Sequence, residues 1–344
     1  MTRSLRSPGL RLRLLLPLLA ALSLPAPGRA EGLPERPEVR AFVDRMAASH
    51  GFPREQLLDW FSRVRIREDI LRAISNPAEA KPWHEYRQIF LTPDRIRGGA
   101  QFMRAHRPAL QRAEATYGVP PEIVTAIMGV ETRYGRYKGR YPVFEALSTL
   151  AFAYPRRSRF FAGELEQFLL LTREEGLDPL GVKGSYAGAM GGPQFISSSF
   201  RGYAVDFDGD GHRDLWTDPD DMIGSIAHYF ARHGWRRGEP VAVPAQVSGD
   251  GAAGLLALGL RPQRTVAELV AAGVRPGTAV PGELPAALIA LEGAGGTEYW
   301  LGFTNFYVIT RYNHSPLYAM AVYQLSREIL AAARPRAARD EAAG

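Results

Sequence analysis

The feature that most constrains this chain is an apolar helical segment, residues 120–131, that ends in a carboxylate. Ile123, Ile127 and Glu131 recur at helical spacing, so they share one face of the predicted helix. This face is expected to point toward the core. Burial disfavours the charged form of a carboxylate and raises its pKa, which is what a general acid near neutral pH requires. Glu131 is therefore the candidate catalytic acid.

An ordinary ion pair is the alternative for Glu131. An arginine such as Arg133 or Arg136 could pair with it where the helix meets solvent, and structural ion pairs also perturb carboxylates. The sequence further along the chain favours the catalytic interpretation.

Residues 184–195 are dense in glycine and alanine and carry few polar side chains. Such a segment lets backbone amides approach a ligand closely, and Gln194 can both donate to and accept from a sugar amide or hydroxyl. The pattern predicts one wall of a cleft. A glycine-rich loop without a ligand is the alternative.

Three blocks of the sequence resemble the lytic murein transglycosylases of the B type. They are GVETRYG at 129–135, AGAMGGPQFISSS at 187–199 and NFYVITRYN at 305–313, in the family's order. The resemblance implies a mainly α-helical protein with a lysozyme-like core that cleaves the β-1,4 bond between N-acetylmuramic acid and N-acetylglucosamine in peptidoglycan. It also implies a reaction without water, in which the C6 hydroxyl of the muramic acid attacks C1 and leaves a 1,6-anhydro ring.

Such a reaction requires a single carboxylate. Ordinary glycosidases use two, about 5 to 9 Å apart, one of them as nucleophile or to activate a water. A substrate that supplies its own nucleophile needs one, and residues 129–135 and 184–195 contain no acid besides Glu131. The hypothesis is that Glu131 protonates the leaving oxygen and then, as carboxylate, takes the proton from the C6 hydroxyl.

The resemblance also implies several contacts with the substrate. Ser185 and Gln194 are expected beside the acid, and Arg156 and Arg157 near the acidic lactyl or peptide groups. Aromatic faces suit the C–H faces of sugar rings. The aromatic positions that the resemblance implies along the cleft are Tyr229, Tyr312 and Tyr318. Core packing with the hydroxyl in water is the alternative for each tyrosine.

A calcium-binding loop is predicted from residue 206 onward. Acids at loop positions one, three, five and nine, with glycine at six, match the first part of an EF-hand loop, whose oxygens suit a hard cation. Position twelve is Thr217, so the closing carboxylate must come later, from Asp218, Asp220 or Asp221, and Asp221 is favoured because a helical pattern follows it. The predicted ligands are Asp206, Asp208, Asp210, His212 and Asp221.

Bound Ca²⁺ would be structural in this loop and would take no part in the chemistry. Arg213 stands where EF-hands usually carry an apolar residue. A solvated acidic turn is the alternative to a metal site.

Residues 1–30 have the features of a secretory signal peptide. Arginines precede an apolar run from Leu14 to Leu24, and Gly28-Arg29-Ala30 is a cleavage signal before Glu31. The apolar run is too short and too interrupted by proline to suit a membrane span. The chain has no cysteine, and Glu31 stands where some family members carry a lipidated cysteine. We therefore expect a protein without a lipid anchor, soluble in the periplasm.

The charge of the chain bears on its partners. The first thirty residues hold five arginines and no acid, so their removal lowers the net charge from +6 to +1. A nearly neutral protein has little electrostatic reason to bind nucleic acid. The expected partners are peptidoglycan glycan strands and other cell-wall enzymes, and no cofactor is expected for the chemistry.

The chain beyond the signal peptide is expected to form subdomains of one fold. Short apolar runs broken by glycine and proline are typical of strands, here with one helix at Val266 to Ala272. The predicted order is a signal peptide at 1–30, an N-terminal helical subdomain at 31–112, a catalytic core with the EF-hand-like loop at 113–235, a small β-rich insertion at 236–300, a helical return to the core at 301–333 and a disordered tail at 334–344.

Three other functions remain open at this point. A hydrolytic muramidase would need a second carboxylate, which Asp206 or Glu145 could supply only if folding brought it near Glu131. A non-catalytic peptidoglycan-binding protein would not need Glu131, Ser185 and Gln194 together. A calcium-sensing scaffold is disfavoured because a single atypical loop makes a poor sensor.

Overall fold

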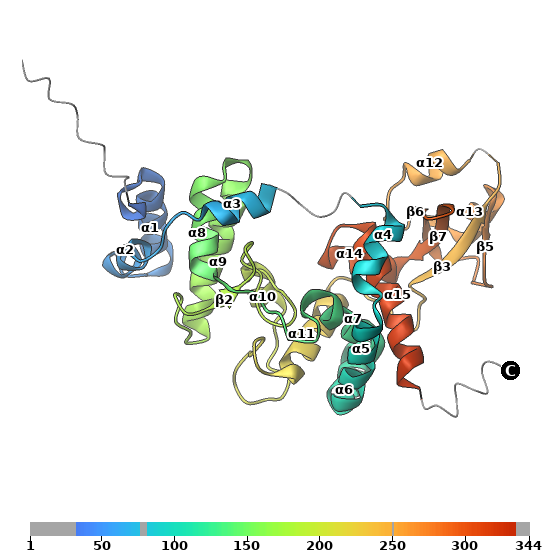
Figure 1. The fold of residues 1–344 in the computed structure, drawn as a ribbon, viewed down its shortest axis with the longest axis horizontal. Coiled ribbons are helices and arrows are strands. Elements are labelled where there is room, and N and C mark those ends of the chain that lie inside the picture. Colours follow the sequence, from blue (N-terminus) through green and yellow to red (C-terminus); the bar gives the residue numbers. More distant parts are fainter. Residues whose placement is uncertain (1–31, 76–80, 250, 335–344) are drawn as a thin grey trace, which may run out of the picture.

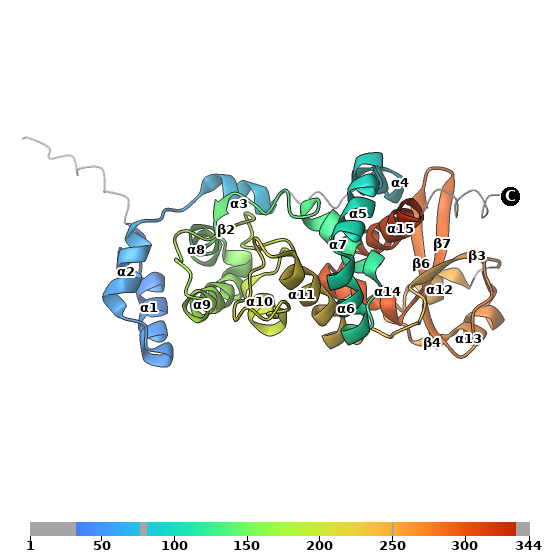
Figure 2. The same ribbon diagram turned by 90° about the horizontal axis from the view of Figure 1, so that it is seen from below.

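The computed structural model of the chain describes residues 32–75, 81–249 and 251–334. The predicted signal peptide at 1–30, and the predicted tail after its first residue, lie outside the described residues. Within those ranges the chain is mainly helical, which confirms the predicted class. The helices form two lobes, and a small sheet lies at one end of the molecule (Figures 1 and 2).

The first lobe gathers helices from two distant stretches of the chain. It comprises α1 (Pro37–His50), α2 (Arg54–Ser62), α3 (Glu68–Ser75), α8 (Val143–Ala153) and α9 (Ser158–Glu174). Aromatic rings join the two stretches: the ring centroids of Phe61 and Phe144 are 5.0 Å apart, and those of Phe42 and Phe152 are 5.9 Å apart. Ring pairs at these separations add to the free energy of burial. The N-terminal helices are thereby held against α8.

The second lobe is built around α7. Its helices are α4 (Trp83–Phe90), α5 (Pro93–Ala105), α6 (Arg107–Tyr117), α7 (Pro121–Thr132), α11 (Pro219–Arg232), α14 (Thr304–Tyr312) and α15 (Pro316–Ala333). Helix α7 packs against α5, α6, α11 and α15, and every residue from Ile123 to Gly129 is buried. It begins with a proline at its first position, where no hydrogen bond is lost. The residue after its last turn is Arg133, whose φ of 49° is left-handed and ends the helix.

A five-stranded antiparallel sheet lies beyond the second lobe, in the order β4-β6-β7-β3-β5. Its strands are β3 (Ala242–Val247), β4 (Arg264–Thr265), β5 (Val274–Pro276), β6 (Pro285–Gly293) and β7 (Gly296–Phe303). Two short helices, α12 (Ala252–Leu256) and α13 (Val266–Ala271), accompany it. Thr265 and Glu268 form a capping box that starts α13. A small apolar cluster that includes Leu269, Leu288 and Leu301 gives this sheet a core of its own.

Three short elements lie on the segments that connect the two lobes: β1 (Tyr141–Pro142), β2 (Lys183–Gly184) and α10 (Ser197–Tyr203). Two 3₁₀ helices, η1 (Leu33–Glu35) and η3 (Pro155–Arg157), belong to the first lobe. Strands β1 and β2 pair antiparallel, with Tyr141 opposite Gly184. This pairing fixes the start of the glycine-rich segment close to the chain that leaves α7.

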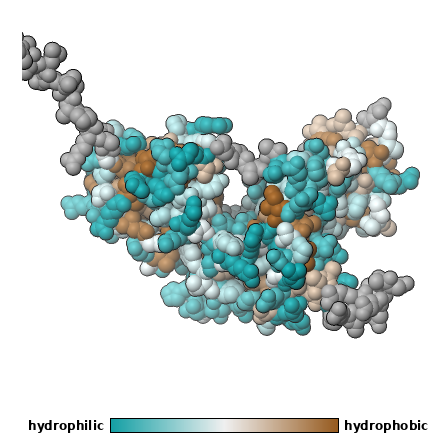
Figure 3. Space-filling model, viewed as in Figure 1, coloured by the Kyte–Doolittle hydropathy of each residue, from teal (hydrophilic) through white to brown (hydrophobic). Residues whose placement is uncertain are grey.

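The surface is hollowed between the two lobes, as Figure 3 shows. Polar and apolar residues alternate over the face in view, without a broad apolar band. Among the residues that the structure describes, no helix combines the length and the apolar character needed to cross a membrane.

Candidate active site

Glu131 lies in the last turn of α7, on the same face as the buried Ile123 and Ile127. Its side chain is partly buried. The hydroxyl of Tyr318, on α15, donates a hydrogen bond to Oε1 of Glu131 at 2.5 Å. Tyr318 itself is 3% exposed. The predicted acid and one of the predicted tyrosines are therefore in direct contact.

Burial is the main influence on the protonation of Glu131. It raises the pKa of this carboxyl to about 7, against the opposing effect of the Tyr318 hydrogen bond, which favours the carboxylate. Burial and the nearby Glu131 charge hold the pKa of Tyr318 well above its usual range, so the phenol keeps its proton and acts as the donor. Near neutral pH both forms of Glu131 are consequently populated, as a group that must give and then take a proton requires.

The structure does not support an ion pair for Glu131. Arg133 and Arg136 are exposed, and neither is bonded to Glu131 within the described ranges. The possible second carboxylates are also engaged elsewhere. Glu145 lies on α8 and accepts a hydrogen bond from Arg67 at 3.0 Å, while Asp206 accepts the backbone N–H groups of the loop that follows it. Burial and Tyr318 alone account for the shifted pKa of Glu131.

Tyr229 and Tyr312 form an aromatic wall with Phe195. The ring centroids of Tyr229 and Tyr312 are 4.9 Å apart, and Phe195 is 5.6 Å and 5.8 Å from them. The hydroxyl of Tyr312 donates to the Pro193 carbonyl at 2.7 Å, and that of Tyr229 to the Arg311 carbonyl at 2.6 Å. Burial and then the charge of Glu131 hold the pKa of Tyr312 well above its usual range. These tyrosines anchor the glycine-rich segment to α11 and α14.

Two glycines let the glycine-rich segment pass close to its neighbours. A Cβ on Gly191 would lie 2.3 Å from the Leu215 carbonyl oxygen, and the φ of Gly191 is +69°. A Cβ on Gly192 would lie 2.4 Å from the sulfur of Met222. Real Cβ contacts are not so short, so only glycine fits without a shift. The predicted wall is therefore packed directly on the last part of the acidic loop and on the helix that follows it.

Gln194 and Ser185 occupy opposite ends of this segment. Gln194 has a left-handed φ of 53°, and its Nε2 donates to the Gly191 carbonyl at 2.8 Å. No described residue hydrogen-bonds its Oε1. The hydroxyl oxygen of Ser185 accepts the N–H groups of Ala187 and Ala189, at 3.2 Å and 3.0 Å. Each side chain thus supports the loop and keeps hydrogen-bonding capacity for a ligand.

Arg156 and Arg157 lie in η3, between α8 and α9 of the first lobe. Both are exposed. The guanidinium of Arg157 is 4.2 Å from the centroid of Phe160. Within the described residues the two arginines form no hydrogen bond or ion pair with Glu131, Ser185 or Gln194, so the structure does not bring this pair into contact with the acid.

The acidic loop has the form of the first part of an EF-hand. Carboxylate oxygens of Asp206, Asp208 and Asp210 lie within 4.8 Å of one another. Asp206 accepts the N–H groups of Gly209 and Gly211, at 2.7 Å and 2.9 Å, and Gly211 at loop position six has a φ of +94°. Three hard oxygen donors in this arrangement suit a calcium ion.

Asp221 and His212 have different places in this loop. Asp221 is 1% exposed, and its two oxygens accept the N–H groups of Phe207 at 2.6 Å and Asp214 at 2.7 Å. It therefore ties the two ends of the loop together. His212 is exposed, and its N–H donates to Asp210 at 2.8 Å, as expected for a position that offers its backbone carbonyl.

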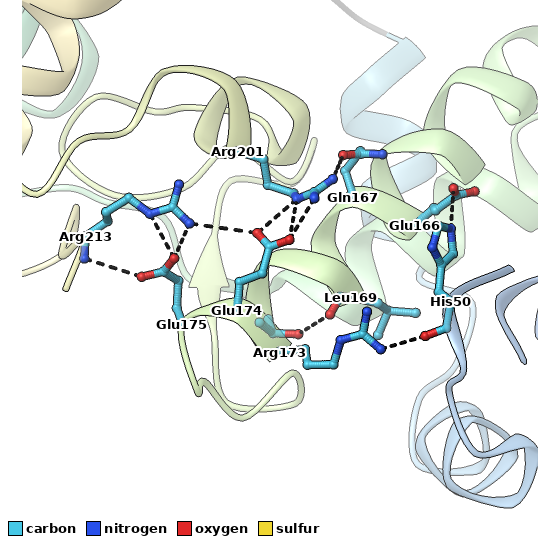
Figure 4. A network of polar contacts seen from close by, with 10 residues as sticks. His50, Glu166, Gln167, Leu169, Arg173, Glu174, Glu175, Arg201 and Arg213 are labelled. Atoms are coloured by element: carbon cyan, nitrogen blue, oxygen red, sulfur yellow. Dashed lines mark hydrogen bonds and ion pairs between the residues drawn. The ribbon is translucent and has the colours of Figure 1, made fainter. Parts of the chain in front are cut away.

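Arg213 departs from the EF-hand pattern because it has a partner outside the loop. Its Nε donates to Glu175 at 2.8 Å, at the end of α9 (Figure 4). Arg201 of α10 donates through its Nε to Oε2 of the neighbouring Glu174 at 3.0 Å. Figure 4 shows the two pairs side by side. An apolar residue would not make this ion pair, which attaches the loop to the first lobe.

The chain matches known proteins over most of its length. The model of the transglycosylase SLT domain family matches residues 34–327. The membrane-bound lytic murein transglycosylase B of Escherichia coli K12 is 46% identical over 303 residues, covering 85% of this chain and 82% of the relative. The chain belongs to this transglycosylase family. The resemblance seen in the sequence is thereby confirmed, as is the prediction of an enzyme.

Solved structures agree with this membership. The transglycosylase superposes on the soluble lytic transglycosylase SltB1 of Pseudomonas aeruginosa with a TM-score of 0.82 and 51% identity, covering 86% of this chain and 99% of that one. The Escherichia coli lytic transglycosylase Slt35, solved in complex with calcium, superposes with a TM-score of 0.80 and 46% identity. The match covers 87% of this chain and 94% of that one. SltB3 of Pseudomonas aeruginosa, solved with NAG-anhNAM-pentapeptide, superposes with a TM-score of 0.77 and 31% identity. The match covers 85% of this chain and 79% of that one. The predicted lysozyme-like fold is confirmed by these relatives.

Two residues of the transglycosylase site were not predicted from the sequence. Thr132 follows the acid directly and is 1% exposed; its hydroxyl lies 3.0 Å from the Gly192 carbonyl oxygen and accepts the N–H of Gly135 at 3.0 Å. Lys138 donates to the Trp216 carbonyl at 2.5 Å. A buried threonine beside an acid is a usable sequence signal, whereas nothing in the sequence places Lys138 near residue 216.

Proposed function

We propose that this transglycosylase cleaves the β-1,4 bond between N-acetylmuramic acid and N-acetylglucosamine in peptidoglycan and leaves a 1,6-anhydro ring, for remodelling and turnover of the cell wall. The observation that carries the proposal is a single partly buried carboxylate, Glu131, with a pKa of about 7 and a tyrosine donor on one oxygen. One group that changes protonation near neutral pH suffices when the substrate supplies the nucleophile.

The proposed reaction uses Glu131 twice. In its protonated form it gives its proton to the bridging oxygen, and the bond from that oxygen to C1 of the muramic acid breaks. The carboxylate then accepts the proton of the C6 hydroxyl while O6 bonds to C1. Because Tyr318 occupies Oε1, the proton travels through Oε2. Acid and base are restored, and no water is consumed.

The remaining predicted side chains are proposed as substrate contacts. Gln194 has a free Oε1 for a sugar N–H or hydroxyl, and the Ser185 hydroxyl keeps its proton for donation. The aromatic wall of Tyr229 and Tyr312 supports sugar rings, and Tyr318 adds the hydrogen bond to the acid. Arg156 and Arg157 are proposed to meet acidic groups of strands that extend over the first lobe.

Calcium is proposed as a structural ion in the acidic loop. The oxygens of Asp206, Asp208 and Asp210 fit it by type and by their closeness, and the related Slt35 was solved with calcium. His212 is proposed to contribute its carbonyl and Asp221 to close the loop. The ion would hold residues 206–217 rigid behind the glycine-rich segment.

The proposed location is the periplasm, after removal of residues 1–30. The support is the sequence pattern of that segment, with Glu31 in place of a lipidated cysteine. The Escherichia coli relative is described as membrane-bound. We propose that this chain differs from it by lacking an anchor.

Digestion of purified sacculi in H₂¹⁸O tests the proposed reaction. If the C6 hydroxyl is the nucleophile, the released fragments carry no ¹⁸O at the new end. A hydrolytic muramidase would place one ¹⁸O in each new reducing end. Binding to sacculi without any release would instead favour the non-catalytic function.

A further inference from the structure

A polar cavity lies beside the end of α7, apart from the aromatic wall. Its volume is about 550 Å³, and it is formed by the first turns of α5 and the chain that leaves α7. Four arginines line it: Arg95, Arg97, Arg133 and Arg136. The single acid in the lining, Asp94, is bound to Arg97. The cavity therefore carries a net positive charge.

Arg95 is the most unusual member of this lining. It is 8% exposed, yet no carboxylate pairs with it in the part of the chain that the structure describes. One of its nitrogens donates to the Ile89 carbonyl, whereas its buried Nε has no hydrogen-bond partner among the described residues. Its guanidinium also lies 5.1 Å from the centroid of the Phe90 ring, but no acid among the described residues neutralises its charge. A buried charge without a counterion is costly in free energy. A bound anion would remove that cost.

On the other side of the cavity, Arg133 and Arg136 also carry positive charges that no described acid neutralises. Both are exposed, and neither forms an ion pair with a described residue. Burial and then the charge of Arg133 lower the pKa of Arg95, as expected where cations face one another without an acid between them. Guanidinium groups bind carboxylates through paired N–H donors.

The position of the cavity relates it to the reaction. Arg133 is two residues beyond Glu131, so their Cα atoms are at most about 8 Å apart. The peptide stem of peptidoglycan starts on the muramic acid whose C1 reacts, and an extended peptide spans about 3.4 Å per residue. A stem on the reacting sugar can thus reach the cavity with its first few residues.

We propose that this cavity binds a carboxylate of the peptide stem on the reacting muramic acid, through Arg95, Arg133 and Arg136. The inference rests on the proposed function, because it assumes that Glu131 marks the reacting bond. It predicts an enzyme that prefers glycan with acidic stems. Arg156 and Arg157 lie on the other lobe and are not part of this cavity.

The test compares two substrates and two variants. Glycan strands with intact stems are used as such, or after conversion of the stem carboxylates to amides with carbodiimide and ammonia. The variant R133Q/R136Q removes two exposed charges of the cavity. The control R140Q removes an exposed charge of the same loop that stacks on Tyr141 outside the cavity.

For the unmodified protein we expect amidation of the stems to lower kcat/KM about tenfold, the loss typical of one charge-assisted hydrogen bond. R133Q/R136Q should show this loss on the acidic substrate and no further loss on the amidated one, while R140Q should behave as the unmodified protein does. Equal sensitivity to amidation in R133Q/R136Q and the unmodified protein would overturn the inference.

The two proposals fail in different ways. Hydrated ends from both substrates would reject the proposed reaction, while the ratio of the two rates still tests the cavity. A binding measurement adds a readout without turnover. Titration of E131Q with NAG-NAM-pentapeptide should give a Kd about tenfold lower than titration of the same variant that also carries R133Q/R136Q; equal values would contradict the site.

Discussion

The hydroxyl of Tyr318 donates a hydrogen bond of 2.5 Å to Oε1 of Glu131, although the two residues are 187 positions apart in the chain. Burial raises the pKa of Glu131 to about 7, and this hydrogen bond keeps it from rising further because it favours the carboxylate. Helix α15 thus adjusts the pH range, set mainly by burial, in which an acid on α7 can both give and take a proton.

Replacing Tyr318 by phenylalanine should raise the pKa of Glu131. The ring stays and the donor is lost, so the carboxylate loses its stabilisation. Because Glu131 must be protonated to start the reaction, the alkaline limb of kcat/KM should move upward by about one pH unit. Y323F, on the same helix but packed against Trp300, should leave the limb in place; the same shift in both variants would contradict the assignment.

E131Q should stabilise the fold at alkaline pH. The pKa of Glu131 is about 7 when folded and 4.5 as its ordinary value, so the folded state holds the proton more tightly. The contribution of this group to stability is therefore fully present below pH 4.5 and is lost as the pH rises through 7. Glutamine cannot ionise, so E131Q keeps its stability as the pH rises through 7. The free energy of unfolding of E131Q should exceed that of the unmodified protein by roughly 3 kcal/mol at pH 8 and match it near pH 4. Equal stabilities at pH 8 would show that the carboxyl is not perturbed.

Gly191→Ala should destabilise the wall of the cleft. The new Cβ would meet the Leu215 carbonyl at 2.3 Å, at a φ of +69°. We expect a loss of about 1 to 3 kcal/mol in unfolding free energy, together with a fall in kcat. The matched control is G202A in α10, where the Cβ meets nothing within 4 Å. Alanine there should be neutral or stabilise by about 0.5 to 1 kcal/mol, so similar losses in both variants would count against the account.

The hydroxyl of Thr132 should position the acid. T132V keeps the shape but leaves the Gly135 N–H without its acceptor, whereas T132S keeps the hydroxyl. T132V is expected to lose about 1 to 3 kcal/mol of stability and to lower kcat more than it changes KM. T132S should restore most of kcat. Equal activity of the two variants would assign this residue to packing alone.

Calcium should raise the melting temperature, because a ligand that binds only the folded state stabilises it. D208N removes a charge from the acidic loop but keeps the oxygen that accepts the Asp210 N–H. It should abolish most of the calcium-dependent shift measured by thermal unfolding. D178N, whose side chain accepts the Leu180 N–H in another turn, should retain the shift. If millimolar calcium left the melting temperature of the unmodified protein unchanged, the proposed calcium site would be rejected.

Local patterns explain what the sequence could predict. The spacing of Ile123, Ile127 and Glu131 placed a carboxylate on an apolar helix face, and the structure buries that face. The density of glycine at 184–195 indicated close backbone contact, which Gly191 and Gly192 make. Both signals can be read from residues that lie within a dozen positions of one another in the chain.

Contacts between distant segments could not be predicted in this way. Tyr318 reaches Glu131 only because α15 packs against α7, and Arg213 has its partner Glu175 at the end of another helix. The sequence also gave no reason to group Arg95 with Arg133, since two helices lie between them. The first lobe likewise joins α1–α3 to α8 and α9, although the sequence order places these two groups of helices in separate predicted subdomains.

Mass analysis of the muropeptides released from purified sacculi tests the central claim most directly, with E131Q measured alongside. The account predicts fragments one water lighter than the hydrolysed species, formed by the unmodified protein and absent with E131Q. Hydrated reducing ends, or anhydro products that persist with E131Q, would contradict it.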